Sequence, residues 1–141
     1  MEKIKKMLHE GNHSLVIRTD IDEIFAFDGR GISDLLQLLH VSPDLLAGAV
    51  VADKVVGKAA AALMAEGGVR DVYAFTLSRQ AVEMLDKRRI AWSCGEMVDH
   101  IVNRDGTGWC PMELCCRDCT TPQQCHAAII KKIEEFKNKR Q

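Results

Sequence analysis

The sequence predicts an α/β domain of three layers, α-β-α, in which the middle layer is a mixed five-stranded sheet. Short β-type segments alternate along the chain with segments of helical periodicity, which is the pattern of this class. Residues 46–52 (Leu-Ala-Gly-Ala-Val-Val-Ala) form a continuous apolar run, as expected of a strand covered on both faces. With 141 residues, of which 47% are hydrophobic, the chain suits a single domain, 1–141. We expect its core to span about 13–136, with loose ends at 1–12 and 137–141.

The N-terminal part predicts a β-hairpin followed by a helix. Residues 14–19 and 23–27 are rich in β-type residues, and Asp20-Ile21-Asp22 between them suits a turn. The two strands would form the antiparallel part of the mixed sheet. Four leucines within 35–39 then predict a short amphipathic helix that ends at Pro43.

The middle of the chain predicts two strand–helix units and a fifth strand. The apolar strand 46–52 leads into an expected helix whose apolar face is Val55, Val56, Ala59, Ala60, Leu63 and Met64. Residues 69–76 are the next strand, and Ser78 caps the following helix. Residues 90–94 complete the sheet. Such βαβ units place parallel strands side by side through right-handed crossovers.

The C-terminal part predicts three further helical segments, the first of them short and within 97–102. In the second, Pro111 suits the first helical position and Cys110 the N-cap, so the Glu113 carboxylate can reach back to the N–H group of Cys110. The last helix begins with Thr121 as cap, and Gln124 completes its capping box. Its apolar stripe is Cys125, Ile129, Ile133 and Phe136.

Two blocks of the sequence carry a family resemblance. One is the strand–helix block 50–61 (Val-Val-Ala-Asp-Lys-Val-Val-Gly-Lys-Ala-Ala-Ala), and the other is the loop 103–113 (Asn-Arg-Asp-Gly-Thr-Gly-Trp-Cys-Pro-Met-Glu). With the order of elements, they resemble the cytidine-deaminase-like fold, and an uncharacterised bacterial family of that superfamily in particular, over about residues 13–130. The resemblance implies the fold, and no established activity comes with it.

The zinc site of the cytidine deaminases is absent from this sequence. Those enzymes use a His-x-Glu helix start and a Pro-Cys-x-x-Cys helix start. None of the five histidines is followed by Glu two residues later, and the second block has Cys110-Pro111 in the reverse order. We therefore expect no zinc deaminase activity, and the cofactor, if any, stays unknown.

Our first functional hypothesis is the binding of an anionic or nucleotide-like small molecule. On a helix that starts after the apolar strand, Lys54 and Lys58 share one face, at the sheet edge where α/β proteins bind ligands. They would either hold a phosphate or carboxylate or form a solvated face. The other candidate ligand-binding residues accompany them in the two blocks: Asp53, Gly57, Asn103, Gly106, Thr107, Gly108, Cys110 and Glu113. The glycine loop can point N–H groups at an anion, or it is simply a tight turn.

A second hypothesis is a metal-independent enzyme that works in the same cleft. The Cys110 thiol would lie at a helix N-terminus, where the helix dipole favours the thiolate. Cys110 would act as a nucleophile and Lys54 as a general base or electrostatic clamp. Alternatively, both residues have structural roles: Cys110 is a half-buried capping residue, and Glu113 is the partner in that cap.

The cysteine cluster supports a third hypothesis, a thiol or metal sensor. Five of the six cysteines lie between Cys110 and Cys125. Clustered thiols can hold zinc or an iron–sulfur cluster, form a redox pair, or serve as small buried apolar residues. The candidate ligands are Cys115, Cys116, Cys119 and Cys125.

Composition limits the classes of partner that we expect for this protein. The net charge of −1 argues against nucleic-acid binding, and no apolar run is long enough for a membrane span. So many cysteines without a secretion signal indicate reduced thiols and a cytoplasmic protein. A homodimer through an exposed sheet edge or helix face is compatible with the sequence.

Overall fold

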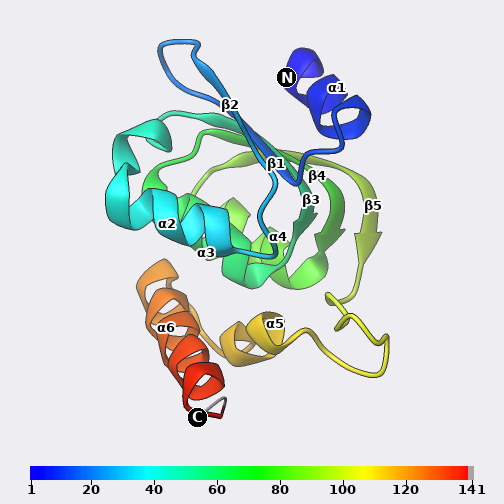
Figure 1. The fold of residues 1–141 in the computed structure, drawn as a ribbon, viewed down its shortest axis with the longest axis vertical. Coiled ribbons are helices and arrows are strands. Elements are labelled where there is room, and N and C mark those ends of the chain that lie inside the picture. The colour runs from blue at the N-terminus through cyan, green and yellow to red at the C-terminus, as the bar shows by residue number, and fades with distance from the viewer. Residues whose placement is uncertain (140–141) are drawn as a thin grey trace.

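The structure, a computed structural model, describes residues 1–139 as one α/β domain (Figure 1). Its elements are α1 (Glu2–Glu10), β1 (Leu15–Arg18), β2 (Ile24–Phe27), α2 (Ser33–Val41), the 3-10 helix η1 (Pro43–Leu45), β3 (Val50–Val56), α3 (Lys58–Gly67), β4 (Asp71–Ser78), α4 (Arg79–Lys87), β5 (Ala91–Val98), α5 (Pro111–Cys116) and α6 (Pro122–Lys139).

The sheet is mixed and five-stranded, as predicted. Its strand order is β2-β1-β3-β4-β5. Strand β1 is antiparallel to β2 and to β3, whereas β3, β4 and β5 are mutually parallel. The hairpin predicted from the N-terminal segments therefore forms one edge, and the two βαβ units form the rest.

Helices lie on both faces of the sheet. Because β3, β4 and β5 follow one another in one direction, right-handed crossovers place α3 and α4 on the same face. On that side, α3 is buried along Lys58–Met64, and α5 and α6 pack on it from outside (Figure 1). The alanines make α3 apolar on nearly all sides, and a helix of this kind must be covered by other elements. The opposite face is covered over β1 and β3 by α1.

Helical residues occupy most of the described part of the two segments, 1–12 and 137–141, that the sequence predicted to be loose ends. Helix α1 occupies most of 1–12, and Ile4 and Leu8 are fully buried against Val16 and Ala52 of the sheet. The apolar pair four residues apart is what holds this otherwise charged helix. Residues 137–139 continue α6, and residues 140–141 lie outside the described part.

Strand β3 starts and ends later than predicted. It runs from Val50 to Val56, and α3 starts only at Lys58, with Gly57 as its N-cap. Val55 and Val56 fit the apolar face of a helix, but β-branched residues also favour a strand, and pairing with Thr76 and Leu77 of β4 decides the outcome. Lys54 is therefore a strand residue, and it does not share a helix face with Lys58.

Strand β5 also extends beyond its predicted end. The helix expected within 97–102 is absent, because β5 continues to Val98 in register with β4. The Thr76 hydroxyl donates a hydrogen bond of 2.8 Å to Glu96 across this pair. The predicted caps of two helices are confirmed: Ser78 Oγ accepts from the Ala81 N–H group, and Thr121 and Gln124 form the capping box of α6.

Glu113 joins three parts of the chain. Cys110 is the N-cap of α5 and Pro111 its first residue, as predicted, but the Glu113 carboxylate does not reach back to Cys110. Instead it accepts 2.7 Å hydrogen bonds from the N–H groups of Lys58, at the start of α3, and of Ile101. The side chain is 1% exposed. The predicted capping box is thus replaced by a long-range cap on α3.

Asp53, a predicted ligand-binding residue, lies in the interior of β3. Burial raises the pKa of its carboxyl from 3.8 to about 7, and the negative charge of Asp34 adds to this effect. The backbone N–H groups of Val55, at 3.3 Å, and of Lys54 act against this rise by stabilising the carboxylate.

Replacing Glu113 with alanine should destabilise the domain by about 3 kcal/mol or more, since two buried N–H groups lose their acceptor. Glu113→Gln should cost less, because the amide oxygen can still accept one of the bonds. Urea unfolding measures both. Glu83, exposed on α4, supplies the control Glu83→Ala, which should stay within about 0.5 kcal/mol. Equal stability of Glu113→Ala and Glu83→Ala would contradict the cap.

The raised pKa of Asp53 predicts a pH-dependent stability. The folded state holds this proton more tightly than the unfolded chain, so the contribution is complete below pH 3.8 and is lost as the pH rises towards about 7. The Asp53→Asn variant should therefore gain stability over the parent as the pH increases, by a few kcal/mol at most near pH 8 (~1.4 kcal/mol per pKa unit). Urea midpoints of both proteins at pH 5 and pH 8 test this. A difference between the proteins that does not change with pH would refute it.

Candidate functional site

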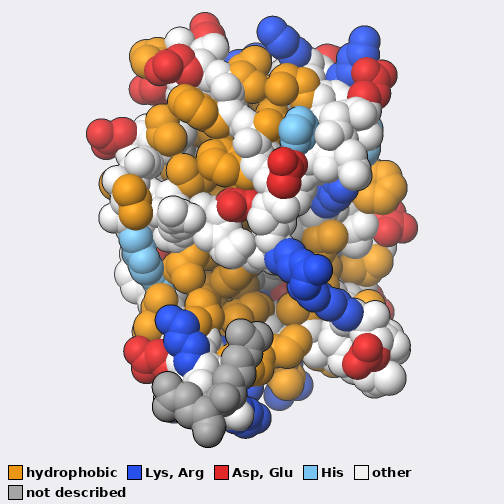
Figure 2. Space-filling model, viewed as in Figure 1, with side chains coloured by type: hydrophobic (Ala, Val, Ile, Leu, Met, Phe, Trp, Pro, Cys, Tyr) orange, Lys and Arg blue, Asp and Glu red, His pale blue; other side chains and the backbone are white. Residues whose placement is uncertain are grey.

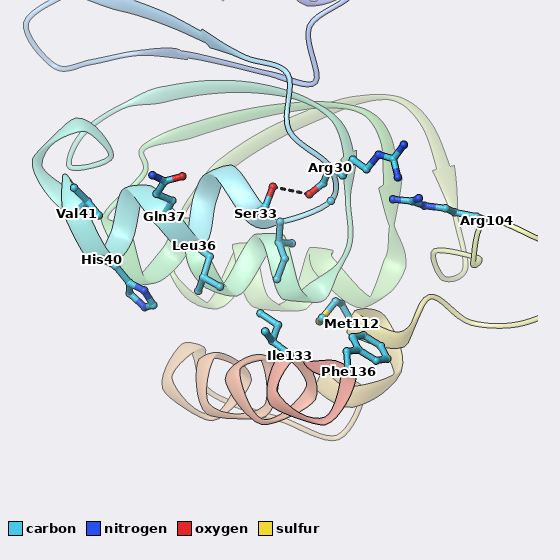
Figure 3. Close-up of a pocket in the computed structure, with 12 residues that line it drawn as sticks. Arg30, Ser33, Leu36, Gln37, His40, Val41, Arg104, Met112, Ile133 and Phe136 are labelled. Carbon is cyan, nitrogen blue, oxygen red and sulfur yellow. Dashed lines mark hydrogen bonds between the residues drawn. The ribbon is translucent and has the colours of Figure 1, made fainter. Parts of the chain in front are cut away.

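A groove of about 670 Å³ lies between α2, α5 and α6. In Figure 3, Leu36 of α2 lies above it, and Met112, Ile133 and Phe136 lie below. These side chains make a largely apolar surface. Figure 2 shows hydrophobic side chains in the hollow across the middle of the molecule, with basic side chains at its edge.

Two arginines lie at one end of the groove. Arg30 comes from the loop between β2 and α2, and Arg104 from the loop between β5 and α5 (Figure 3). Within the described residues 1–139, three of the eight arginines have carboxylate partners, namely Arg18, Arg79 and Arg117, and both groove arginines are among the five that have none. Two unpaired guanidinium groups beside an apolar surface attract an anion.

Short-range hydrogen bonds fix the backbone that carries each arginine. The Arg30 carbonyl accepts from the Ser33 hydroxyl at 2.8 Å, and the Asp34 carboxylate accepts from the Gly29 N–H group at 2.8 Å. Next to Arg104, the Asn103 side chain accepts from the Thr107 N–H group at 3.0 Å and donates to the Thr107 hydroxyl. Both guanidinium groups therefore extend from turns of defined shape.

A hydrogen-bond chain closes the other end of the groove. His40 lies there, with its Nε2 atom 3.1 Å from Nε2 of His126 on α6. The Nδ1 atom of His126 lies 2.7 Å from the Glu66 carboxylate of α3. These contacts join α2, α6 and α3, so the two walls of the groove are held together at this end.

A smaller apolar cavity of about 120 Å³ adjoins the groove and shares Gly31, Ile32 and Met112 with it. Three of the predicted site residues line it: Gly57, Cys110 and Glu113. The structure thus places a small apolar cavity between residues of the two sequence blocks.

The predicted lysine pair does not converge on that cleft. The Lys54 ammonium donates to Asn12 at 3.0 Å on the exposed surface. Lys58 is 8% exposed, and its ammonium donates to the Arg117 carbonyl at 2.9 Å. Neither residue lines either cavity.

The loop glycines serve a turn. Gly106 has φ +70°, a conformation that favours glycine, and the Asn103 and Thr107 side chains bond to each other across the turn. A Cβ atom at Gly106 or Gly108 would meet nothing within 4 Å. Of this loop, Arg104 lines the groove, whereas Asn103, Gly106, Thr107 and Gly108 do not.

Gly57 is required by close packing. A Cβ atom at this position would lie 3.0 Å from both Glu113 Oε1 and Ile101 Cγ1. The missing side chain lets the Glu113 carboxylate reach the start of α3. Because both Glu113 oxygens accept backbone N–H groups, this carboxylate is engaged in the fold and is not placed as a general base.

The cysteines are free thiols. Cys110 is half-buried, while Cys116 and Cys125 are fully buried and Cys115 and Cys119 partly exposed. Among residues 1–139 there is no group of three or more His, Cys, Asp or Glu side chains arranged to hold a metal ion.

Sequence reasoning missed the groove and its arginines. Arg30 lies between the predicted hairpin and the predicted helix, in a segment without a predicted role, and Arg104 lies within the block 103–113 without a predicted role of its own. The groove forms because α2 packs on α3 together with α5 and α6, which are far from α2 in sequence. A possible signal was that both arginines stand in glycine-containing loops next to helix starts.

In the described part of the chain, no helix combines the length and the apolar character needed to cross a membrane.

Comparison with known proteins places the chain in a family. The family model described as TM1506, domain of unknown function (DUF1893), matches residues 3–133. A crystal structure of a DUF1893 family protein (TM1506) from Thermotoga maritima is similar, with a TM-score of 0.83 and 23% identity over 93% of this chain and 88% of that one. No curated protein matches. The similarity in structure supports the fold, and the match of the family model over most of the chain shows that it belongs to the DUF1893 family.

Proposed function

We propose that this protein binds a small anionic molecule with an apolar portion in the groove between α2, α5 and α6. The observation that carries the proposal is the pair Arg30 and Arg104, which have no carboxylate partner among residues 1–139 and stand at the end of an apolar groove. This keeps the ligand class expected from the sequence. It replaces Lys54 and Lys58 by the two arginines as the groups that meet the charge.

The shape and chemistry of the groove support this ligand class. Its volume of about 670 Å³ falls in the range of small-molecule sites. Arginine presents planar pairs of N–H donors that match a carboxylate or a phosphate. The apolar portion of the ligand would lie on Leu36, Met112, Ile133 and Phe136, and it could extend into the smaller cavity.

The wider assignment belongs to the same proposal. We assign the fold to the cytidine-deaminase-like superfamily, on the order of its elements and the mixed five-stranded sheet. The protein would be a member without zinc deamination, because α3 carries no ligands where that chemistry needs them. The six free cysteines are consistent with a reducing, cytoplasmic location.

An enzymatic role is the second candidate, and Cys110 favours it. Cys110 is the N-cap of α5, and it lines the smaller cavity that adjoins the groove. A thiol there can reach a bound molecule. Lys54, which bonds to Asn12, would take no part, so the enzyme of this hypothesis would rely on Cys110 alone. Turnover that disappears in Cys110→Ser while binding persists would distinguish it from a binding domain.

The fluorescent probe 8-anilinonaphthalene-1-sulfonate, an aromatic anion, tests the groove directly. The parent should bind it, and Arg30→Ala and Arg104→Ala should each weaken binding by about tenfold, since a charge-assisted hydrogen bond contributes about 1.5–3 kcal/mol. Binding should also weaken with added salt. Straight-chain alkyl carboxylates and alkyl phosphates should then displace the probe, whereas the matching alcohols should not.

Arg79→Ala supplies the matched control, because Arg79 is an exposed arginine on α4 away from the groove. It should leave probe binding unchanged. If both groove variants bind as tightly as the parent, the arginines do not form the site. If alcohols displace the probe as well as carboxylates do, the site is apolar only and the proposed ligand class is wrong.

A further inference from the structure

Four thiols gather where the end of α5 meets α6, apart from the groove. Cys115 and Cys116 end α5, Cys119 follows in the next turn, and Cys125 faces them from α6. The Sγ atoms of Cys115 and Cys116 are 3.9 Å apart, and Cys116 Sγ lies 3.8 Å from the Cys125 carbonyl oxygen. None of the four lines the groove or the smaller cavity.

The backbone holds Cys116 and Cys119 at a separation that a disulfide can span. They form a Cys-x-x-Cys unit closed into a turn, since the Cys119 N–H group donates to the Cys116 carbonyl at 3.0 Å. Such a turn brings its first and last Cα atoms within about 7 Å, close to the ~4.4–6.8 Å that a disulfide spans. Cys115 and Cys116 do not qualify, because adjacent Cα atoms are only about 3.8 Å apart.

We propose that Cys116 and Cys119 are a redox-active dithiol that forms a disulfide by exchange with a small-molecule disulfide. Cys119 is partly exposed and would be the residue that meets the incoming disulfide. Cys116 is fully buried beside it and would complete the bond. The inference is independent of the proposed ligand groove and uses none of the groove's residues.

Lys58 and Cys125 provide the charge that this chemistry needs. The Lys58 ammonium is buried and donates to the carbonyl of Arg117, inside the Cys-x-x-Cys turn. Hydrogen bonding from Cys116 is the main cause that lowers the pKa of Cys125 to about 7, and Cys119 and the Lys58 charge add to it. Burial and the nearby Cys125 charge raise the pKa of Cys119. These shifts favour the thiolate form at Cys125 and the protonated thiol at Cys119.

The reaction then proceeds in two exchanges. Cys119 passes its proton to the Cys125 thiolate as its sulfur attacks one sulfur of the incoming disulfide, so that a mixed disulfide forms and one thiolate leaves. The Cys116 sulfur next attacks Cys119 Sγ and displaces the second thiolate. The Cys116 proton and the proton held on Cys125 are taken up by the two departing thiolates. In sum, two protein thiols are oxidised and one small disulfide is reduced to two thiols.

The test is to incubate the full-length protein with oxidised glutathione, then to alkylate it and map its peptides by mass spectrometry. We expect a Cys116–Cys119 disulfide and four remaining thiols. Six free thiols, a lasting mixed disulfide in the parent, or a link that involves any other cysteine would overturn the proposal.

Single serine variants separate the roles. Cys116→Ser should accumulate a glutathione adduct on Cys119, and Cys119→Ser should accumulate none on Cys116. Cys125→Ser should form the disulfide about tenfold more slowly, and its rate should lose the rise near pH 7, because the proton acceptor is gone. Cys94→Ser, on β5, is the control and should behave like the parent. A Cys125→Ser rate and pH profile equal to those of the parent would remove Cys125 from the mechanism.

Discussion

The Glu113 carboxylate is the contact on which the arrangement of both candidate regions depends. Helix α5 has six residues, too few to be stable alone, so its position must come from tertiary contacts. Through Glu113 it caps the start of α3 and holds the Ile101 backbone, where the chain leaves the sheet. Gly57 makes this possible because its missing side chain leaves room for the carboxylate. With α5 fixed, Met112 becomes part of the groove surface, and the Cys-x-x-Cys turn lies beside Lys58.

The alanine-rich helix α3 sets the spacing of the layers around this contact. Its small side chains allow the sheet on one side and α5 and α6 on the other to approach closely, so that the helix is buried along Lys58–Met64. Helix α6 is thereby held opposite α2, and the space left between them is the groove. The His40–His126–Glu66 chain then joins the three helices where their surfaces meet. The groove is thus a consequence of packing small residues at the centre and large ones at the edge.

The sequence predicted what depends on local pattern and failed where long-range pairing decides. The hairpin, the mixed sheet, the Ser78 cap and the start of α6 follow from periodicity and capping residues, and all are confirmed. The start of α3 was misplaced because Val55 and Val56 fit a strand and a helix equally well until β4 pairs with them. Glu113 was expected to cap its own helix and caps another, since only the tertiary fold brings the α3 start within reach. The pairing of Arg30 with Arg104 could not be predicted for the same reason, since only the tertiary fold brings their two loops to one end of the groove.

The two proposed activities act on opposite ends of α5 and through different chemistry. At the groove, the guanidinium groups would attract the negative charge of a ligand, and the apolar surface would hold the rest of the ligand. Neither role requires a thiol. At the other end of α5, the buried Lys58 charge stabilises a thiolate, and neither groove arginine belongs to that cluster. A buried ammonium needs a counter-charge or good acceptors, and the Arg117 carbonyl accepts from Lys58 at 2.9 Å. Lys58, predicted from the sequence as an anion-binding residue, instead directs its ammonium group to the Arg117 carbonyl of its own chain.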